Sequence, residues 1–217
     1  MNPKIKVCGM RESANIQQIL DLKPDYMGFI FQEKSPRFAG EILDEELLKS
    51  FPKTTKKVGV FVNAHIDLIL RNVKKYNLDI VQLHGDESPE MCRNIRSRGV
   101  TIIKAFPMEN DFKFNRLNNF KTPCDYFLFD TKGHNYGGNG VQFDWDILQK
   151  YDNSRPFFLS GGISLEDVEK LKKISSNLNL HAFDINSKFE DEPGFKNVEM
   201  VKTFINNFRN ILHETTV

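Results

Sequence analysis

The first stretch of the chain that could carry chemistry is Ile5-Lys6-Val7-Cys8-Gly9. Ile5 and Val7 are apolar strand residues, and Gly9 interrupts the strand directly after Cys8, so the thiol lies at the carboxyl end of the first predicted strand. A cysteine in such a place is either a small buried apolar residue or a reactive group. A thiol ionises not far above neutral pH, and neighbouring cations lower its pKa. Cys8 is therefore a candidate base.

Asp130 is the candidate acid, because it ends the apolar run Tyr126-Phe127-Leu128-Phe129. A carboxyl group partly removed from water has a raised pKa and can donate a proton, although a carboxylate that caps its own loop is the ordinary alternative. His84 follows the apolar residues 80–83 in the same way, and it either faces the same site or is satisfied within its own loop. An acid and a base on different strands suit proton transfer on a bound sugar.

Short apolar runs alternate with segments of helical periodicity along the whole chain. The runs predict strands over residues 5–8, 26–31, 58–62, 80–84, 101–106, 126–130, 157–159 and 182–185. Helical stripes follow them, and Ser164 with Asp167 resembles a capping box at the start of one helix. Residues 107–123 fit neither period, so we expect a short helix or an irregular cover there.

Eight strands alternating with helices predict a parallel sheet, and in 217 residues they favour a closed α/β barrel, the (β/α)8 TIM barrel. No linker or change of composition divides the chain, so residues 1–217 are expected to form a single catalytic domain. Such barrels carry their chemistry on the loops that follow the strands. Cys8, Arg37, His84 and Asp130 are therefore expected to meet at one mouth, where a purely structural barrel needs none of them.

The turns after the seventh and eighth strands predict a phosphate site. Gly161 and Gly162 follow the seventh strand and can expose backbone N–H groups to an anion. Asp184 lies near the end of the eighth strand, and the turn that follows, from Asn186 to Lys188, could offer the N-terminus of a short extra helix with Ser187 as a donor. Two adjacent glycines alone are weak evidence, because turns need glycine anyway.

Composition excludes several classes of function. The formal net charge of +1 argues against nucleic acid or an anionic membrane as the main partner. No apolar run has the length of a membrane span and no signal peptide is evident, so we expect a cytoplasmic protein. The three cysteines are scattered, which is typical of reduced thiols, and we expect Cys92 and Cys124 to be packing residues. We expect no metal, no cofactor and a monomer.

The same residues carry a resemblance to the phosphoribosylanthranilate isomerase family of tryptophan biosynthesis. The matches run in chain order over nearly the whole sequence: Lys6-Val7-Cys8-Gly9, Ser35-Pro36-Arg37, Val60-Phe61-Val62-Asn63, Gln82-Leu83-His84-Gly85, Phe129-Asp130-Thr131, Gly137-Gly138-Asn139-Gly140, Phe143-Asp144-Trp145, Ser160-Gly161-Gly162 and Asp184 through Glu190. Each motif is modest alone, but together they are specific.

The resemblance implies an Amadori rearrangement of a phosphosugar, phosphoribosylanthranilate, with Cys8 as general base and Asp130 as general acid. It implies that Arg37 binds the anthranilate carboxylate, which a bidentate guanidinium suits; a solvated loop arginine is the alternative. His84, Gly137 and Gly138 are expected to contact the substrate. The expected phosphate ligands are Gly161, Gly162, Asp184, Asn186, Ser187 and Lys188.

The chain departs from the family pattern near the phosphate. The usual Ser-Gly-Val-Glu reads Ser187-Lys188-Phe189-Glu190 here, so that either the turn changes shape or Lys188 adds a cationic contact. Asn139 and Ser160 also replace the usual residues of their motifs. The rival interpretations are another phosphosugar barrel enzyme, such as a pentose-phosphate epimerase or indole-glycerol phosphate synthase, and a non-catalytic barrel that binds phosphorylated ligands. The metal ligands that an epimerase needs are not evident in the sequence, and neither is the lysine-rich mouth of the synthase. The presence of both Cys8 and Asp130 disfavours a non-catalytic barrel.

Overall fold

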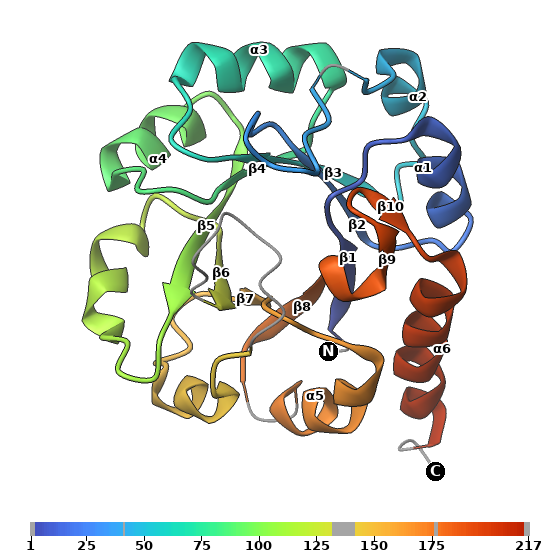
Figure 1. Cartoon of the computed structure of the whole chain (residues 1–217). Coiled ribbons are helices and arrows are strands. Elements are labelled where there is room, and N and C mark those ends of the chain that lie inside the picture. Colours follow the sequence, from blue (N-terminus) through green and yellow to red (C-terminus); the bar gives the residue numbers. More distant parts are fainter. Residues whose placement is uncertain (1–2, 41, 132–141, 176–177, 215–217) are drawn as a thin grey trace.

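The computed structural model describes residues 3–40, 42–131, 142–175 and 178–214, with side chains described up to residue 209 of the last helix. Eight strands form a closed barrel in sequence order (Figure 1). Every neighbouring pair is parallel, including β1 with β8. The predicted TIM barrel is confirmed. The strands are β1 (Lys4–Val7), β2 (Tyr26–Ile30), β3 (Lys56–Phe61), β4 (Ile80–Leu83), β5 (Thr101–Met108), β6 (Tyr126–Thr131), β7 (Phe157–Leu159) and β8 (Leu180–Ile185).

Helices surround the barrel and cover its outer surface (Figure 1). The α-helices are α1 (Ser13–Leu20), α2 (Glu45–Lys49), α3 (Ile66–Tyr76), α4 (Pro89–Arg96), α5 (Val168–Ser175) and α6 (Val198–Glu214). The 3-10 helices are η1 (Phe114–Phe120), η2 (Trp145–Lys150), η3 (Leu165–Asp167) and η4 (Ser187–Phe189). The predicted capping box is present, because Ser164 and Asp167 cap one another's backbone at the start of η3. No helix in the described ranges is long and apolar enough to cross a membrane.

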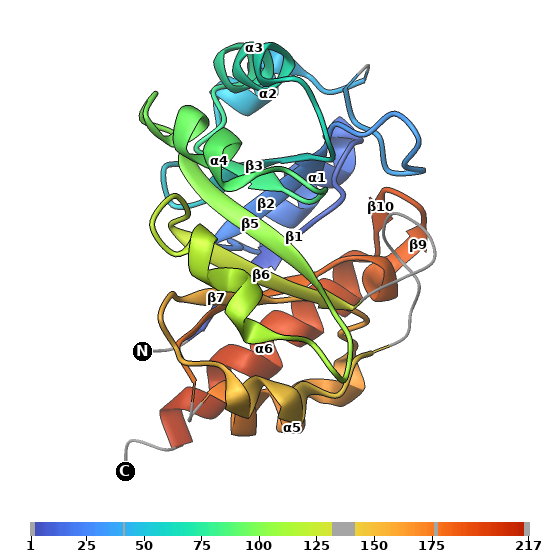
Figure 2. The ribbon, with the colours of Figure 1, turned by 90° about the vertical axis from the view of Figure 1, so that its left-hand side faces the viewer.

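The structure differs from the sequence prediction at several strand ends and in one added hairpin; β3 and β8, for example, each begin two residues earlier than predicted. The fifth strand extends to Met108, two residues beyond its predicted end, and η1 then supplies the short helix expected within 107–123. A hairpin of β9 (Glu190–Glu192) and β10 (Phe195–Lys196) follows η4, where the sequence pattern predicted no strands. This hairpin lies at the end of the barrel where the strands finish (Figure 2).

The barrel has an apolar layer outside its strands and a smaller one within. Outward residues such as Phe127, Phe129 and Phe157 are fully buried against the helices. Burying a side chain of this size contributes about 1.5–3 kcal/mol to the free energy of folding. The inner cluster is made of side chains that point into the barrel, among them Val58, Ile80, Ile103, Ala105, Leu128, Phe158 and Ala182. Along each strand, alternate residues point inward. The same period of two directs the residues at the strand ends into the mouth.

Candidate active site

Cys8 follows β1 at the mouth of the barrel, with its residue only 5% exposed. Its backbone N–H donates to the carbonyl of Ile185 at 2.9 Å, which ties the thiol's position to the end of β8. Gly28 on β2 provides the room for the sulfur, because a Cβ added there would lie 2.7 Å from Sγ of Cys8. The position of the thiol therefore depends on three strands.

Lys6 and Asp184 lie below Cys8 and form a buried ion pair, with 2.7 Å between Nζ and Oδ2. The pKa of the Cys8 thiol is raised above its ordinary value, because burial raises it most, the charge of Asp184 adds to this, and the positive charge and hydrogen bond of Lys6 offset only part of the rise. Burial alone would lower the pKa of Lys6, but Asp184 and Cys8 raise it above its ordinary value. The lysine is thus held as a cation within reach of the thiol.

Asp130 lies on β6 and is joined to His84, which follows β4. Nε2 of His84 lies 3.1 Å from Oδ2 of Asp130, and the side chain of Asp130 is 20% exposed. Nε2 of the Gln82 amide lies 2.8 Å from Nδ1 of His84, so with the amide donating, the imidazole proton points toward Asp130. Thr131 donates its backbone N–H to Oδ1 of Asp130 at 3.0 Å. Among the described residues the carboxyl group has no other hydrogen-bond partner, so its remaining lone pairs can share a proton with a ligand.

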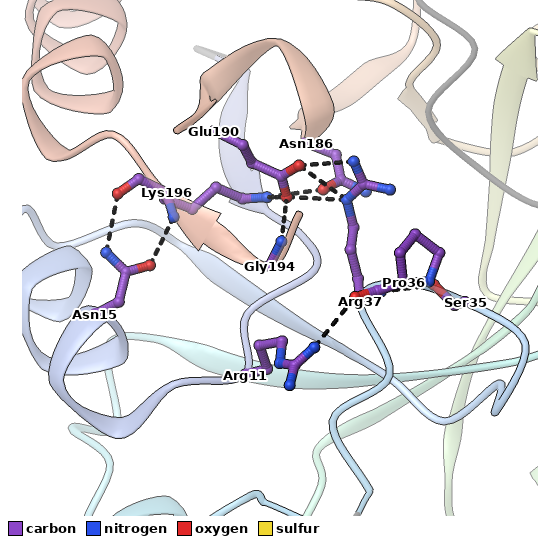
Figure 3. A network of polar contacts seen from close by, with 9 residues as sticks. All are labelled: Arg11, Asn15, Ser35, Pro36, Arg37, Asn186, Glu190, Gly194 and Lys196. Atoms are coloured by element: carbon purple, nitrogen blue, oxygen red, sulfur yellow. Dashed lines mark hydrogen bonds and ion pairs between the residues drawn. The ribbon is translucent and has the colours of Figure 1, made fainter. Parts of the chain in front are cut away.

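Arg37 is buried at the mouth, and Glu190 from the hairpin binds it through both carboxylate oxygens (Figure 3). The distances to Glu190 are 2.9 and 3.0 Å from Nε and 2.6 Å from Nη2. Lys196 of β10 also contacts Glu190, and it donates to Oδ1 of Asn186 at 2.7 Å. The alternative of a solvated loop arginine does not describe Arg37, since its side chain is 8% exposed.

The predicted phosphate residues gather where β7 and β8 end side by side. Gly161 has a φ of 94°, and a Cβ on it would lie 2.6 Å from the backbone nitrogen of Thr131, so glycine is required for both conformation and space. Gly162 also has a positive φ, of 70°. Beyond β8, η4 begins at Ser187, and Lys188 within it is exposed. Gly137 and Gly138 lie outside the described residues.

Asp184 differs from the other predicted phosphate residues. Its carboxylate is buried inside the barrel against Lys6, and it would repel an anion. The geometry therefore favours an electrostatic role beside Cys8 over phosphate binding. Cys92 and Cys124 are fully buried in the outer layer, and their thiols contact one another.

Sequence reasoning missed several residues that shape this site, including Gln82, which contacts His84. Four others either contact a predicted site residue or act on it through their charge: Lys6, Gly28, Glu190 and Lys196. In the sequence, each looks like an ordinary strand or loop residue. A lysine in the middle of a buried strand was the available signal for Lys6. Among the described residues, no group of three or more His, Cys, Asp or Glu side chains could hold a metal ion.

The comparisons with known proteins agree on one family. The model of the N-(5'-phosphoribosyl)anthranilate isomerase family matches residues 5–207. The isomerase of Parabacteroides distasonis is 43% identical over 210 residues, which are 96% of this chain and 93% of that protein.

Three solved structures of isomerases extend the match to three dimensions. That of Thermotoga maritima superposes with a TM-score of 0.82 and 32% identity over 96% of this chain and 99% of its own. Another, in complex with reduced 1-(o-carboxyphenylamino)-1-deoxyribulose 5-phosphate, has a TM-score of 0.80 and 30% identity over the same shares of the two chains. The dimeric Thermotoga maritima enzyme has also been solved as monomers generated from it, with a TM-score of 0.78 and 29% identity over 95% of this chain and 98% of that one.

Proposed function

Because the chain belongs to the N-(5'-phosphoribosyl)anthranilate isomerase family, we propose that Cys8 and Asp130 are the general base and general acid of its reaction. The protein is a phosphoribosylanthranilate isomerase of tryptophan biosynthesis. It converts N-(5-phosphoribosyl)anthranilate to 1-(2-carboxyphenylamino)-1-deoxyribulose 5-phosphate. This Amadori rearrangement moves protons within one molecule and needs an acid and a base held on different sides of the sugar.

The observation that carries the two roles is the position of both groups at strand ends of one mouth. Asp130 protonates the furanose ring oxygen, and the bond from that oxygen to C1 breaks to give an open-chain Schiff base. Cys8, as the thiolate, then removes the proton from C2. The resulting enolamine tautomerises to the ketone. Lys6 favours the thiolate, and His84 orients Asp130.

The substrate's two anionic ends are assigned to separate parts of the mouth. Arg37 binds the anthranilate carboxylate with the edge of its guanidinium that Glu190 does not engage. The backbone N–H groups of Gly161, Gly162 and the turn from Asn186 to Lys188 bind the phosphate, with Lys188 adding charge from the exposed side of η4. His84, Gly137 and Gly138 complete the substrate contacts.

The remaining assignments follow from the sequence. We infer one catalytic domain over residues 1–217 that needs no cofactor, acts in the cytoplasm and works as a monomer. Because the Thermotoga maritima relative is dimeric, the oligomeric state of this chain is tested separately. Sedimentation of the purified protein over a range of concentrations measures it directly.

The direct test is an assay of the purified protein on freshly generated phosphoribosylanthranilate. The expected result is loss of substrate fluorescence with the appearance of a chromatographically separate ketose product, whose unchanged mass excludes hydrolysis of the substrate. The Cys8→Ala/Asp130→Asn double variant is the control for spontaneous decay of the substrate. Equal rates for the wild type and this variant would contradict the proposed roles of both residues.

A further inference from the structure

A buried cluster of four polar side chains lies beside the candidate base. It consists of Arg37, Asn186, Glu190 and Lys196, and these come from the loop after β2, the end of β8 and the hairpin β9–β10 (Figure 3). The side chains of Arg37, Glu190 and Lys196 are 8%, 4% and 0% exposed. The cluster adjoins Cys8, because a Cβ added to Gly9 would lie 2.6 Å from Oδ1 of Asn186 and 2.9 Å from Cδ of Arg37.

The cluster contains one carboxylate for two cations. Although burial raises the pKa of Glu190, Arg37 and Lys196 together lower it below its ordinary value, so Glu190 is charged. Burial lowers the pKa of Lys196 to about 8 despite the opposing effects of Glu190 and Cys8, so its ammonium is still charged at neutral pH. With both cations and Glu190 charged, the cluster carries one excess positive charge.

The shared carboxylate decides how much of that charge Arg37 can offer. Glu190 accepts from Arg37 through both oxygens and from Lys196 through Oε1. Nη1 of Arg37 has no hydrogen-bond partner within the described part of the chain. If Lys196 were neutral or absent, Arg37 would be the one cation paired with Glu190 among the described residues, and this neutral ion pair would attract a carboxylate only weakly.

We propose that Lys196 is a positioning residue that shares Glu190 with Arg37 and thereby keeps the Arg37 guanidinium available to the anthranilate carboxylate. This inference rests on the role proposed above for Arg37. Lys196 does not itself touch the substrate. Its backbone is fixed independently of its ammonium group, because the amide of Asn15 binds both its N–H and its carbonyl (Figure 3).

The experiment compares two ligands that differ only in the carboxylate. One is reduced 1-(o-carboxyphenylamino)-1-deoxyribulose 5-phosphate, and the other is the same compound made from aniline. The ratio of their dissociation constants at pH 7 measures the preference for the carboxylate. Lys196→Met should reduce this preference by about tenfold or more, the scale of one charge-assisted hydrogen bond, while the aniline compound binds as it does to the wild type. Lys202→Met on α6 is the control, since Lys202 is exposed and paired only with Glu199 among the described residues.

A second variant separates shared charge from simple packing. The Lys196→Met/Glu190→Gln double variant again contains one uncompensated cation, Arg37, so its preference for the carboxylate should recover toward that of the wild type. A packing role predicts that the second substitution adds further loss. An unchanged preference in Lys196→Met, or a preference that falls further in the double variant, would overturn the proposal.

The Arg37→Gln variant distinguishes the failure of this proposal from the failure of the proposed function. Arg37→Gln should abolish the preference for the carboxylate. If it does so while Lys196→Met binds both ligands like the wild type, only the role of Lys196 is wrong. If Arg37→Gln keeps the preference, the carboxylate is bound elsewhere, and the assignment of Arg37 is overturned together with that of Lys196.

Discussion

Lys6 and Asp184 occupy paired positions of β1 and β8 and form an ion pair of 2.7 Å in the interior of the barrel. Cys8 lies two residues after Lys6 on the same face of the chain, so the pair is directly beneath the thiol. Oδ1 of Asp184 is buried and has no hydrogen-bond partner within the described residues. The ion pair holds opposite charges near one titrating sulfur.

Substitutions in this pair should move the pKa of Cys8 in opposite directions. Lys6→Met removes the cation and should raise the thiol pKa further, whereas Asp184→Asn removes the anion and should lower it. The measurement is the rate of alkylation of Cys8 against pH, followed by peptide mass spectrometry. Lys4→Met is the matched control on the same strand. Identical pH profiles for Lys6→Met and the wild type would contradict the electrostatic role.

Cys8→Ser should reduce kcat by roughly 10²–10⁴-fold, the usual range for a positioned proton-transfer group. A hydroxyl keeps the size of the thiol but is far too weak a base near neutral pH. Because the thiolate is the active form, kcat/KM of the wild type should rise with pH as Cys8 ionises. The measurement is kcat of the Cys8→Ser variant and of the wild type by steady-state kinetics, together with the thermal midpoint of each protein. A folded and fully active Cys8→Ser variant would mean that Cys8 is only a packing residue. Cys92→Ser is the control and should leave kcat unchanged.

Asp130→Asn should reduce turnover by about 10²–10⁴-fold while the protein still folds and binds reduced product. The amide is nearly isosteric but cannot donate a proton to the ring oxygen. Single-turnover kinetics and titration with the reduced product separate chemistry from binding. Near-wild-type turnover in this variant would exclude Asp130 as the acid.

Lys188→Ala should raise KM for the substrate with little change in kcat, and the effect should weaken as salt is added. Lys188 is exposed on η4, so its contribution is a screened charge and not a buried contact. The measurement is KM at low and high ionic strength. An unchanged KM at low salt would mean that the backbone groups bind the phosphate unaided.

His181 should make the fold sensitive to acid. Burial, with a contribution from Lys4, lowers the pKa of His181 from 6.5 to about 4, and its Nε2 lies 2.7 Å from the Tyr26 hydroxyl. Between pH 6.5 and about 4 the unfolded chain therefore binds more protons than the folded protein. The contribution of the neutral His181 to the free energy of unfolding is complete above pH 6.5 and is lost as pH falls toward 4. His181→Gln should flatten the difference in thermal midpoint between pH 7 and pH 4. An equal loss of midpoint in both proteins would contradict this assignment.

The sequence alone determined the barrel and the residues at its mouth. Short apolar runs separated by helical stripes permit few architectures in a chain of this length, and the end of each run is marked by a local change from apolar to polar residues. This local pattern is sufficient to place Cys8 and Asp130 at one mouth. The family motifs supplied the reaction, which spacing alone left open.

Only the tertiary structure decided which side chains share protons and charge. Lys6 meets Asp184 across 178 residues of sequence, and Arg37 meets Glu190 across 153. His84 and Asp130 could be assigned to one mouth but not to one hydrogen bond, and nothing in the local pattern predicted the hairpin that presents Glu190 and Lys196. The physical reason is that strand periodicity is a local property, whereas the interaction of charges depends on distances and burial that exist only once the barrel has closed.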